Sequence, residues 1–309
     1  MFLLRNRVGS RPFGREGAVQ IHGAEEMGKR KRDCAGSTTV AATFSIFLAV
    51  FTIITVYLFI AKPWWFPPSI TEVGDLIDSQ FHRTLIITGI VFVAAQLGLA
   101  WVIFRFRDQN KPAAYSEGNN TMEVVWTLAT IVLFVGLGLY AESAWAIVHF
   151  TPAQPGDLQI EVVGQQFQWN FRYAGPDGKF GRYKTVEQAL AQRKRGDQSA
   201  TPWQLDTTDP DAKDDIITPI MAVPVNREVE LLIRSMDVTH SFFVRELRLK
   251  QDAVPGMTIH MHFTATKTGD YELACAELCG LGHYRMKSTF RVLNETDFAQ
   301  WMKDQAASQ

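Results

Sequence analysis

This sequence of 309 residues lacks three features that would each indicate a common function. It contains only three cysteines, too few for a disulfide framework. Its formal net charge is −1, so no basic field directs it to nucleic acid, and nucleic acid is not among its expected partners. The C-x-x-C-H sequence that attaches a haem covalently does not occur, which argues against a covalently bound haem on this sequence.

Long uncharged apolar runs fill the first half of the chain. They occupy residues 37–61, 84–104 and 124–141, and the last continues helically to about residue 148. Crossing a bilayer takes about 20 apolar residues, and backbone groups in lipid are satisfied within helices, so each run predicts a membrane-spanning helix. The first run is either a signal anchor or a signal peptide that is removed, so we expect two or three such helices.

Basic residues indicate how these helices are oriented. The tail at residues 1–36 is polar and basic, and we expect it to be disordered. The loop of the helical hairpin expected at residues 80–150 contains Arg105, Arg107 and Lys111, which place it in the cytoplasm. The chain after residue 150 then faces the periplasmic, outer side of a bacterial-type inner membrane that the protein crosses more than once.

From about residue 155 the sequence changes to short strands separated by turns. Seven segments are rich in β-branched and aromatic residues, among them LQIEVV, QWNFRY and STFRVL. They predict a compact β-sandwich or barrel over residues 155–302, interrupted by a polar surface insertion at about 183–215. The acidic residues of this insertion either form a solvated surface or steer a basic partner; they are Asp206, Asp209, Asp211, Asp214 and Asp215.

The most informative motif is CAELCGLGHYRM at residues 275–286. It places Cys275, Cys279, His283 and Met286 on one short loop, and His240 lies 35 positions before Cys275. Soft sulfur ligands together with imidazole suit copper, and two cysteines on one loop can bridge a pair of metals that share one electron. A structural zinc site, and reduced cysteines that pack as small hydrophobic residues, are the alternatives. Met286 is a ligand that zinc rarely takes, which favours copper and one-electron transfer.

These motifs resemble those of subunit II of the haem–copper cytochrome c oxidases over roughly residues 80–302. DVTHSF at 237–242, LKQDAVPG at 249–256 and TGDYELACAELCGLGHYRM at 268–286 carry the resemblance. It implies a membrane-anchored α + β protein, with two or three N-terminal transmembrane helices followed by a cupredoxin-like Greek-key β-barrel or sandwich. It also implies a dinuclear copper centre, CuA, whose ligands map onto His240, Cys275, the carbonyl of Glu277, Cys279, His283 and Met286.

The resemblance assigns roles to four further side chains or positions. The Glu277 carboxylate is expected to share a magnesium ion with subunit I, since magnesium takes hard oxygen ligands; the residue alone would indicate an exposed acid. Glu123 matches the carboxylate at the cytoplasmic mouth of a proton pathway, and its alternative role is to complement a helix N-terminus. Phe167 and Trp169 match the region where electrons enter, with Phe167 at the position of the family's first tryptophan. Their alternative role is packing within the strand region.

The function implied is that of an electron-transfer subunit in a respiratory terminal oxidase. It would take electrons from cytochrome c or a similar donor protein and pass them to haem and copper in subunit I, where oxygen is reduced to water with proton pumping. Further oxidase subunits and membrane lipid are expected partners. Because Phe167 replaces a tryptophan, a CuA-bearing subunit of a related nitric oxide reductase stays open as the alternative.

Three other functions fit the sequence less well. The intact ligand set argues against a copper-free quinol oxidase subunit. The three apolar runs argue against a soluble nitrous oxide reductase. The ligands come from two distant segments and would be enclosed, whereas a copper chaperone exposes an exchangeable site.

Overall fold

The computed structural model describes residues 38–63, 65–107, 115, 117–197 and 204–308. The expected basic tail at residues 1–36 lies outside these residues, as does the part of the insertion at 198–203. The described chain divides into two compact units. One comprises residues 38–57, 93–107 and 115, and the other comprises residues 58–92 together with the described chain from 117 onward.

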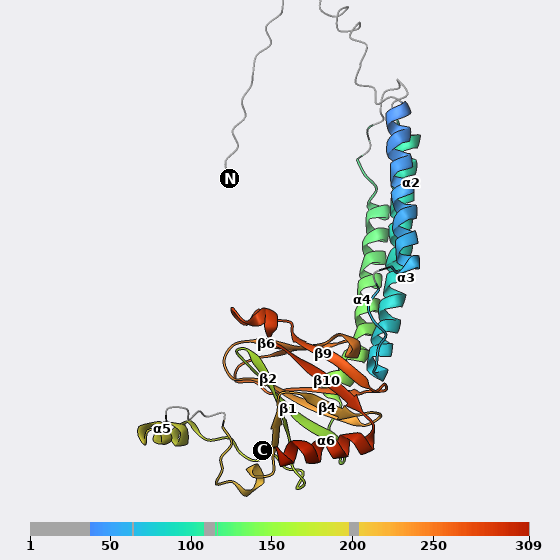
Figure 1. Ribbon diagram of the computed structural model, residues 1–309. Helices are drawn as coiled ribbons and strands as arrows, with labels where there is room; N and C mark the ends of the chain where they lie inside the picture. The colour runs from blue at the N-terminus through green and yellow to red at the C-terminus, as the bar shows by residue number, and fades with distance from the viewer. Residues whose placement is uncertain (1–37, 64, 108–114, 116, 198–203, 309) are drawn as a thin grey trace, which may run out of the picture. The chain divides into compact units, whose positions relative to one another are not determined.

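Three long helices precede the β domain, as the apolar runs predict (Figure 1). They are α2 (Thr38–Ala61), α3 (Glu72–Arg105) and α4 (Asn120–Phe150). Each is long and apolar enough to cross a membrane, so the protein is membrane-anchored. Within the first unit, the Ser45 hydroxyl donates to the carbonyl oxygen of Ala100 at 2.8 Å, which joins α2 to α3.

Two five-stranded sheets form the β domain (Figure 1). One has the order β3-β2-β1-β5-β8 and the other the order β4-β10-β9-β6-β7. The strands are β1 (Leu158–Gln165), β2 (Gln168–Tyr173), β3 (Ile216–Thr218), β4 (Met221–Pro224), β5 (Glu228–Ser235), β6 (His240–Val244), β7 (Leu249–Ala253), β8 (Ile259–Thr264), β9 (Gly269–Cys275) and β10 (Lys287–Leu293). Helices followed by a two-sheet sandwich confirm the expected fold class.

The hydrophobic core lies between the two sheets because alternate residues of each strand point to the same side. In β5, Val229, Leu231 and Ile233 are fully buried, and they join one cluster with Phe242 and Val244 of the facing sheet. Burying each such side chain contributes about 1.5–3 kcal/mol relative to exposure. The core therefore fixes both sheets, including the start of β6, which carries His240, and the end of β9, which carries Cys275.

The first part of α3 packs on the β domain, although the apolar run begins only at residue 84. Val73 is buried in the core cluster, and Asp78 Oδ1 accepts from Arg248 Nε at 2.7 Å. Near the end of α4, Val148 belongs to the same cluster. The beginning of α3 and the end of α4 thus form one compact unit with the sheets.

A short amphipathic helix, α6 (Glu295–Ala307), follows the last strand. Asn294 caps it, because its side chain accepts from the N–H of Asp297 at 2.9 Å. Phe298 is buried, and the Trp301 ring lies 5.4 Å from the ring of Tyr173. The helix therefore adds aromatic side chains to the core of the sandwich.

Candidate metal centre

The motif loop connects the end of β9 to the start of β10 and contains the short 3-10 helix η3 (His283–Arg285). The backbone N–H of Cys275 donates to the carbonyl of Met286 at 3.0 Å, which closes the loop on itself. The N–H of Ala276 donates to the carbonyl of Ser241 at 3.0 Å, which ties the loop to β6. Because His240 begins β6, these bonds bring the distant histidine to the loop.

Soft donor atoms gather inside this loop. The Sγ atoms of Cys275 and Cys279 lie 3.9 Å apart. Cys279 Sγ is 3.7 Å from both Nδ1 of His283 and Sδ of Met286. Cys275 Sγ is 3.2 Å from the backbone carbonyl oxygen of Glu277. The structure therefore brings together the two thiols, the thioether, the imidazole and the carbonyl that the sequence singles out on the loop.

His240 completes the cluster from the neighbouring strand. A ligand nitrogen of His240 and the two cysteine sulfurs all lie within 4.8 Å of one another. The His240 side chain is fully buried, its Nε2 bonds to Asp237 Oδ1 at 2.8 Å, and its Nδ1 has no partner among the described residues. An unpartnered buried nitrogen is costly unless it binds something, so Nδ1 is the nitrogen left for a metal.

Asp237 links His240 to the turn between β1 and β2. Its second carboxylate oxygen accepts from the backbone N–H of Gln166 at 2.8 Å. Partial burial alone would raise the pKa of Asp237, but donation from Gln166, His240 and Val238 outweighs burial and holds that pKa below its usual range. An ionised carboxylate that accepts from Nε2 fixes the His240 ring and favours its Nδ1 as the lone-pair donor.

The β1–β2 turn packs directly on the metal loop. Gln166 Nε2 donates to the carbonyl of Cys279 at 2.6 Å. A Cβ on Gly280 would lie 3.1 Å from the Phe167 ring, and one on Gly282 would overlap it. Gly280 also has φ +131°, a conformation that side chains disfavour. Glycines at 280 and 282 thus allow the Phe167 ring to rest against the loop backbone.

Phe167 and Trp169 differ in their exposure. Phe167 is half-buried against the loop, whereas Trp169 is 1% exposed in the core. The Trp169 ring lies 6.0 Å from the imidazole of His240. Trp169 therefore packs as a strand residue and also contacts the metal cluster, while Phe167 is nearer the surface.

Both thiols are buried, and burial affects the protonation of Cys279. Burial, together with the adjacent Cys275, raises the pKa of Cys279 to about 11. The Cys279 thiol therefore keeps its proton at neutral pH when no metal is bound. Because thiolate is the form that binds metal, metal uptake here must release protons.

Glu277 and Glu123 lie in different surroundings. The Glu277 side chain is exposed, while its carbonyl faces Cys275 Sγ. Glu123 is exposed in the first turn of α4, and the cap is Asn119, which accepts from the N–H of Met122 at 3.1 Å. A negatively charged side chain in this first turn complements the partial positive charge of the helix N-terminus. The role of Glu123 in a proton pathway stays a prediction.

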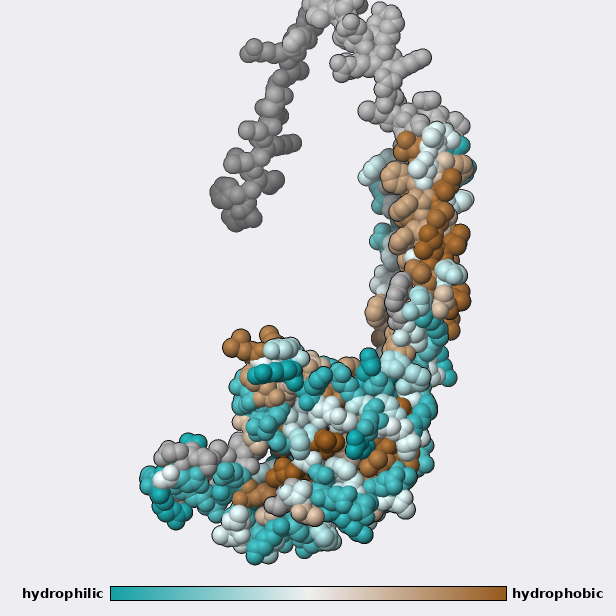
Figure 2. Space-filling model, viewed as in Figure 1, coloured by the Kyte–Doolittle hydropathy of each residue, from teal (hydrophilic) through white to brown (hydrophobic). Residues whose placement is uncertain are grey.

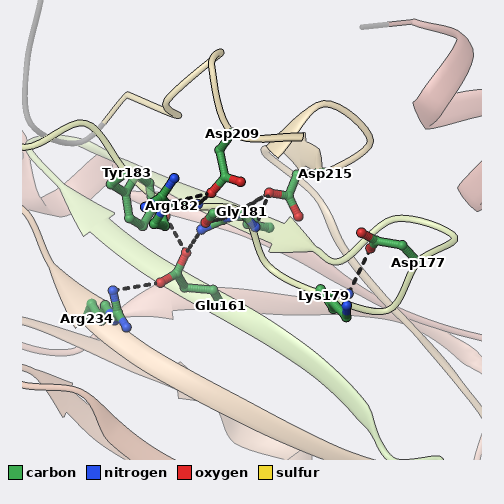
Figure 3. A network of polar contacts seen from close by, with 10 residues as sticks. Glu161, Asp177, Lys179, Gly181, Arg182, Tyr183, Asp209, Asp215 and Arg234 are labelled. Atoms are coloured by element: carbon green, nitrogen blue, oxygen red, sulfur yellow. Dashed lines mark hydrogen bonds and ion pairs between the residues drawn. The ribbon is translucent and has the colours of Figure 1, made fainter. Parts of the chain in front are cut away.

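The acidic part of the insertion folds against the β domain (Figure 3). Asp215 accepts from Arg172 at 2.6 Å and Asp209 from Arg182 at 3.0 Å. Asp206 accepts from Gln188 of helix α5 (Val186–Lys194) at 2.9 Å. These three residues are 5–7% exposed, so interpreting the run as an exposed acidic surface is wrong for them. They are bound within the domain and are not presented to a basic partner.

Sequence reasoning missed two residues of this site, Asp237 and Gln166. Asp237 lies three residues before His240, a spacing that could have signalled a partner for its ring. Gln166 carries no such signal, because its bonds to Asp237 and to the Cys279 carbonyl depend on how distant strands pack.

Several known proteins are similar to this chain in sequence. A family model described as "Cytochrome C oxidase subunit II, periplasmic domain" matches residues 158–292. The chain is 34% identical to the alternative cytochrome c oxidase subunit 2 of Bradyrhizobium diazoefficiens, over 84% of this chain and 91% of that protein. It is 28% identical to cytochrome c oxidase subunit 2 of Cereibacter sphaeroides, over 77% of this chain and 78% of that protein.

A solved structure is also similar. It is the crystal structure of the periplasmic domain of cytochrome oxidase subunit II of Bradyrhizobium japonicum. The two chains are 28% identical with a TM-score of 0.35, and the match covers 51% of this chain and 97% of that one.

Proposed function

Because the chain belongs to the cytochrome c oxidase subunit II family, we propose that it carries electrons from cytochrome c, through a dinuclear copper centre, to oxidase subunit I. Family membership makes it an electron-transfer subunit of a terminal oxidase. The finer proposal is that subunit I uses these electrons to reduce oxygen to water with proton pumping. The β domain would lie on the periplasmic side of a bacterial-type inner membrane, consistent with the basic residues at the other helix ends.

One observation carries the copper proposal: more donors converge than a single tetrahedral metal needs. His240, Cys275, Cys279 and His283 would satisfy the four ligands of a structural zinc. The cluster adds Met286 Sδ at 3.7 Å from one sulfur and the Glu277 carbonyl at 3.2 Å from the other. Each cysteine sulfur thus has its own further donor, so this set of residues would hold two soft metal ions rather than one.

The residues of the chain supply the setting for electron transfer. When bound, two coppers would gain and lose one electron at a time. Cys275, Cys279, Met286 and His240 are all at least nine-tenths buried, which excludes water from the donors. Backbone bonds from the loop to itself and to β6 hold the donors in one geometry, so little has to move when the charge changes.

Phe167 is the proposed point where electrons enter, because its ring rests on the loop that carries Cys279. Trp169, beside His240, is the proposed second contact. We expect Phe167→Ala to slow reduction by the donor and to leave the copper spectrum intact. Stopped-flow kinetics would check this, and donor kinetics equal to those of the wild type would place the entrance elsewhere.

Two carboxylates complete the proposal. The exposed Glu277 side chain would supply one hard oxygen ligand to a magnesium ion shared with subunit I. Glu123, exposed in the first turn of α4, would stand at the mouth of a proton pathway into subunit I.

The deciding experiment is electron paramagnetic resonance with metal quantitation on the copper-loaded full chain. We expect two coppers per chain and a spectrum of one electron shared equally between them. A single-copper spectrum, or zinc in place of copper, would overturn the proposal. Oxygen uptake by the purified complex would then separate an oxidase from the nitric oxide reductase alternative.

A further inference from the structure

A second group of metal-binding residue types lies on the sheet with the order β3-β2-β1-β5-β8. Glu230 of β5 has Gln159 of β1 as its register partner on one side and His262 of β8 on the other. His260, two residues before His262, points to the same face of β8. The residues on either side of Glu230 face the core, so this group lies on the outer face of the sheet.

Both histidines approach the same carboxylate oxygen. Nδ1 of His260 lies 2.7 Å from Glu230 Oε1, and Nε2 of His262 lies 3.7 Å from that atom. The other carboxylate oxygen, Oε2, accepts from Gln159 Nε2 at 2.6 Å. Gln159 thereby holds the carboxylate with Oε1 turned toward the two imidazoles. Bonds of this kind orient the carboxylates that bind metals.

Glu230 lacks the cation that a buried carboxylate needs. Its side chain is 5% exposed, and its ion-pair partners in the part of the chain that the structure describes are the two imidazoles, with no lysine or arginine among them. Glu161, on the same face, is paired with both Arg172 and Arg234, and Figure 3 shows the contact with Arg234. Buried charges in proteins are paired or coordinate metals. Glu230 is therefore an acid that can accept a metal cation.

His262 is incompletely bonded as well. It is 3% exposed, and its Nδ1 has no partner among the described residues. The 3.7 Å gap from its Nε2 to Glu230 is longer than a hydrogen bond. A buried polar nitrogen without a partner is costly, and few occur in folded proteins. A metal ion between Nε2 and Oε1 would bind both groups at once.

We propose that Glu230, His260 and His262 form a binding site for a zinc-type divalent metal ion, separate from the proposed copper centre. Two imidazoles and one carboxylate are a ligand set that zinc takes, with water in the fourth position. The donor atoms around a tetrahedral zinc ion lie about 3.3 Å apart. The distances of 2.7 and 3.7 Å to Glu230 Oε1 lie on either side of that value.

Binding requires one adjustment of the side chains. Among the described residues, the donor atoms of His240, Cys275 and Cys279 are the ones that lie within 4.8 Å of one another, so the imidazoles of His260 and His262 must draw together around the ion. The His260 side chain is 52% exposed, and exposed side chains change rotamer rapidly. The β domain presents a largely hydrophilic surface in Figure 2, in contrast with the apolar helices, so dissolved ions can reach it.

The position of the site predicts what a bound ion does. β8 is an edge strand of its sheet and pairs with β5 alone. Nδ1 of His149, near the end of α4, lies 3.1 Å from the carbonyl oxygen of His260. An ion held by β5 and β8 would fix the edge strand that contacts α4, so it should stabilise the folded protein.

The test uses the full chain in detergent, loaded with copper so that the donors of the metal loop are filled. Zn²⁺ is the probe. Isothermal titration calorimetry gives the number of ions bound and their affinity, and circular dichroism gives the thermal midpoint. The variants are His260→Ala and Glu230→Gln. Their matched controls are His82→Ala, at a half-buried histidine of α3, and Glu228→Gln, at an acid of β5 that accepts from Thr264.

We expect the wild type to bind one Zn²⁺ per chain beside the copper, and its thermal midpoint to rise when zinc is saturating. His260→Ala and Glu230→Gln should each weaken zinc binding by about tenfold or more, because loss of even an outer-shell partner costs about 10–100-fold. Both controls should bind zinc as the wild type does. Excess Mg²⁺ should not displace the zinc, since magnesium prefers oxygen ligands to imidazole.

Three results would overturn this site. One is the absence of saturable zinc binding in the wild type. Another is equal zinc affinity in the wild type, His260→Ala and Glu230→Gln, with near-ultraviolet circular dichroism showing that all three are folded; the zinc would then be an adventitious ion only. The third is displacement of zinc by Mg²⁺. Each comparison is made at equal copper content, so the outcome does not depend on the proposed electron-transfer function.

Discussion

Arg172→Met tests whether a buried charge network holds the sheet that leads to the metal site. Arg172 lies on β2, three residues after Trp169, and is 3% exposed. It donates to Glu161 at 3.1 Å, to Asp215 at 2.6 Å and to the carbonyl of Gly181. Methionine keeps an unbranched apolar stem of similar length but provides no donor, so the buried acids lose their shared cation.

The expected loss of stability depends on which bonding partners Glu161 and Asp215 keep once Arg172 is replaced. Removing one partner of a buried ion pair destabilises a protein by about 3–5 kcal/mol. Glu161 keeps Arg234 at 3.0 Å, and Asp215 keeps the N–H of Gly181 at 3.0 Å. We therefore expect the lower end, about 3 kcal/mol, which is a large part of the ~5–15 kcal/mol typical of a folded domain.

The same variant should show a characteristic pH dependence. Burial raises the pKa of Asp215 in the folded protein, while Arg172 opposes this rise. Without Arg172 the folded-state pKa rises further above the unfolded value. A carboxyl with a raised folded pKa contributes stability below its unfolded pKa and loses it as pH rises through the folded pKa. The destabilisation of Arg172→Met should therefore be largest near neutral pH and shrink as the solution is acidified.

The measurement is urea unfolding of the full chain in detergent, followed by near-ultraviolet circular dichroism of the buried aromatic residues. Arg227→Met is the matched control, because Arg227 pairs with Glu295 at 3.5 Å in an exposed position and should change stability by less than about 1 kcal/mol. Adding Asp215→Asn to Arg172→Met should recover part of the loss. An unchanged urea midpoint for Arg172→Met, or a loss that grows on acidification, would refute this reasoning.

Three further predictions concern the metal cluster. Cys279→Ser should abolish the two-copper spectrum because it removes one of the two sulfurs proposed to bridge the metals. Retention of two coupled coppers, counted by paramagnetic resonance and metal analysis, would reject the bridging role of Cys279. Met286→Leu should keep some copper and shift its reduction potential, since the weak thioether donor that tunes the potential is lost; an unchanged potential in spectroelectrochemistry would count against ligation. Asp237→Asn should weaken copper binding by about 10–100-fold, because His240 loses the carboxylate that orients its ring. Competition with a chelator measures the copper affinity, and an affinity equal to that of the wild type would show that Asp237 does not position the ring.

Much of the fold and of the metal cluster could be predicted because the signals are local. Uncharged runs of sufficient length indicate the three membrane helices. The loop donors lie close in sequence, so a short turn already brings Cys275, Cys279 and Met286 together. His240 was identified from its motif, but only the pairing of β6 with β9 explains how it reaches the loop.

Other features depend on packing that no local pattern encodes. The polar residues 72–83 do not indicate a helix by hydropathy, because their stabilising contacts are the Asp78–Arg248 pair and the domain core. The short strands β3 and β4 lack the length that makes a strand recognisable. The insertion acids appear exposed in sequence because their partners, such as Arg172, lie on a distant strand.

The close packing of the first part of α3 and the end of α4 on the β domain has a consequence for the speed of the proposed onward electron step. The ion pair between Asp78 and Arg248, together with Val73 and Val148 in the core, ties these helix segments to the sheets. Electron tunnelling weakens steeply as the gap between two redox centres widens. A domain swinging on a tether would sample many gaps, and its rate would be an average set by rare close approaches. A domain fused to its helices holds the metal loop at a constant distance from them, so the onward rate is set by the protein framework.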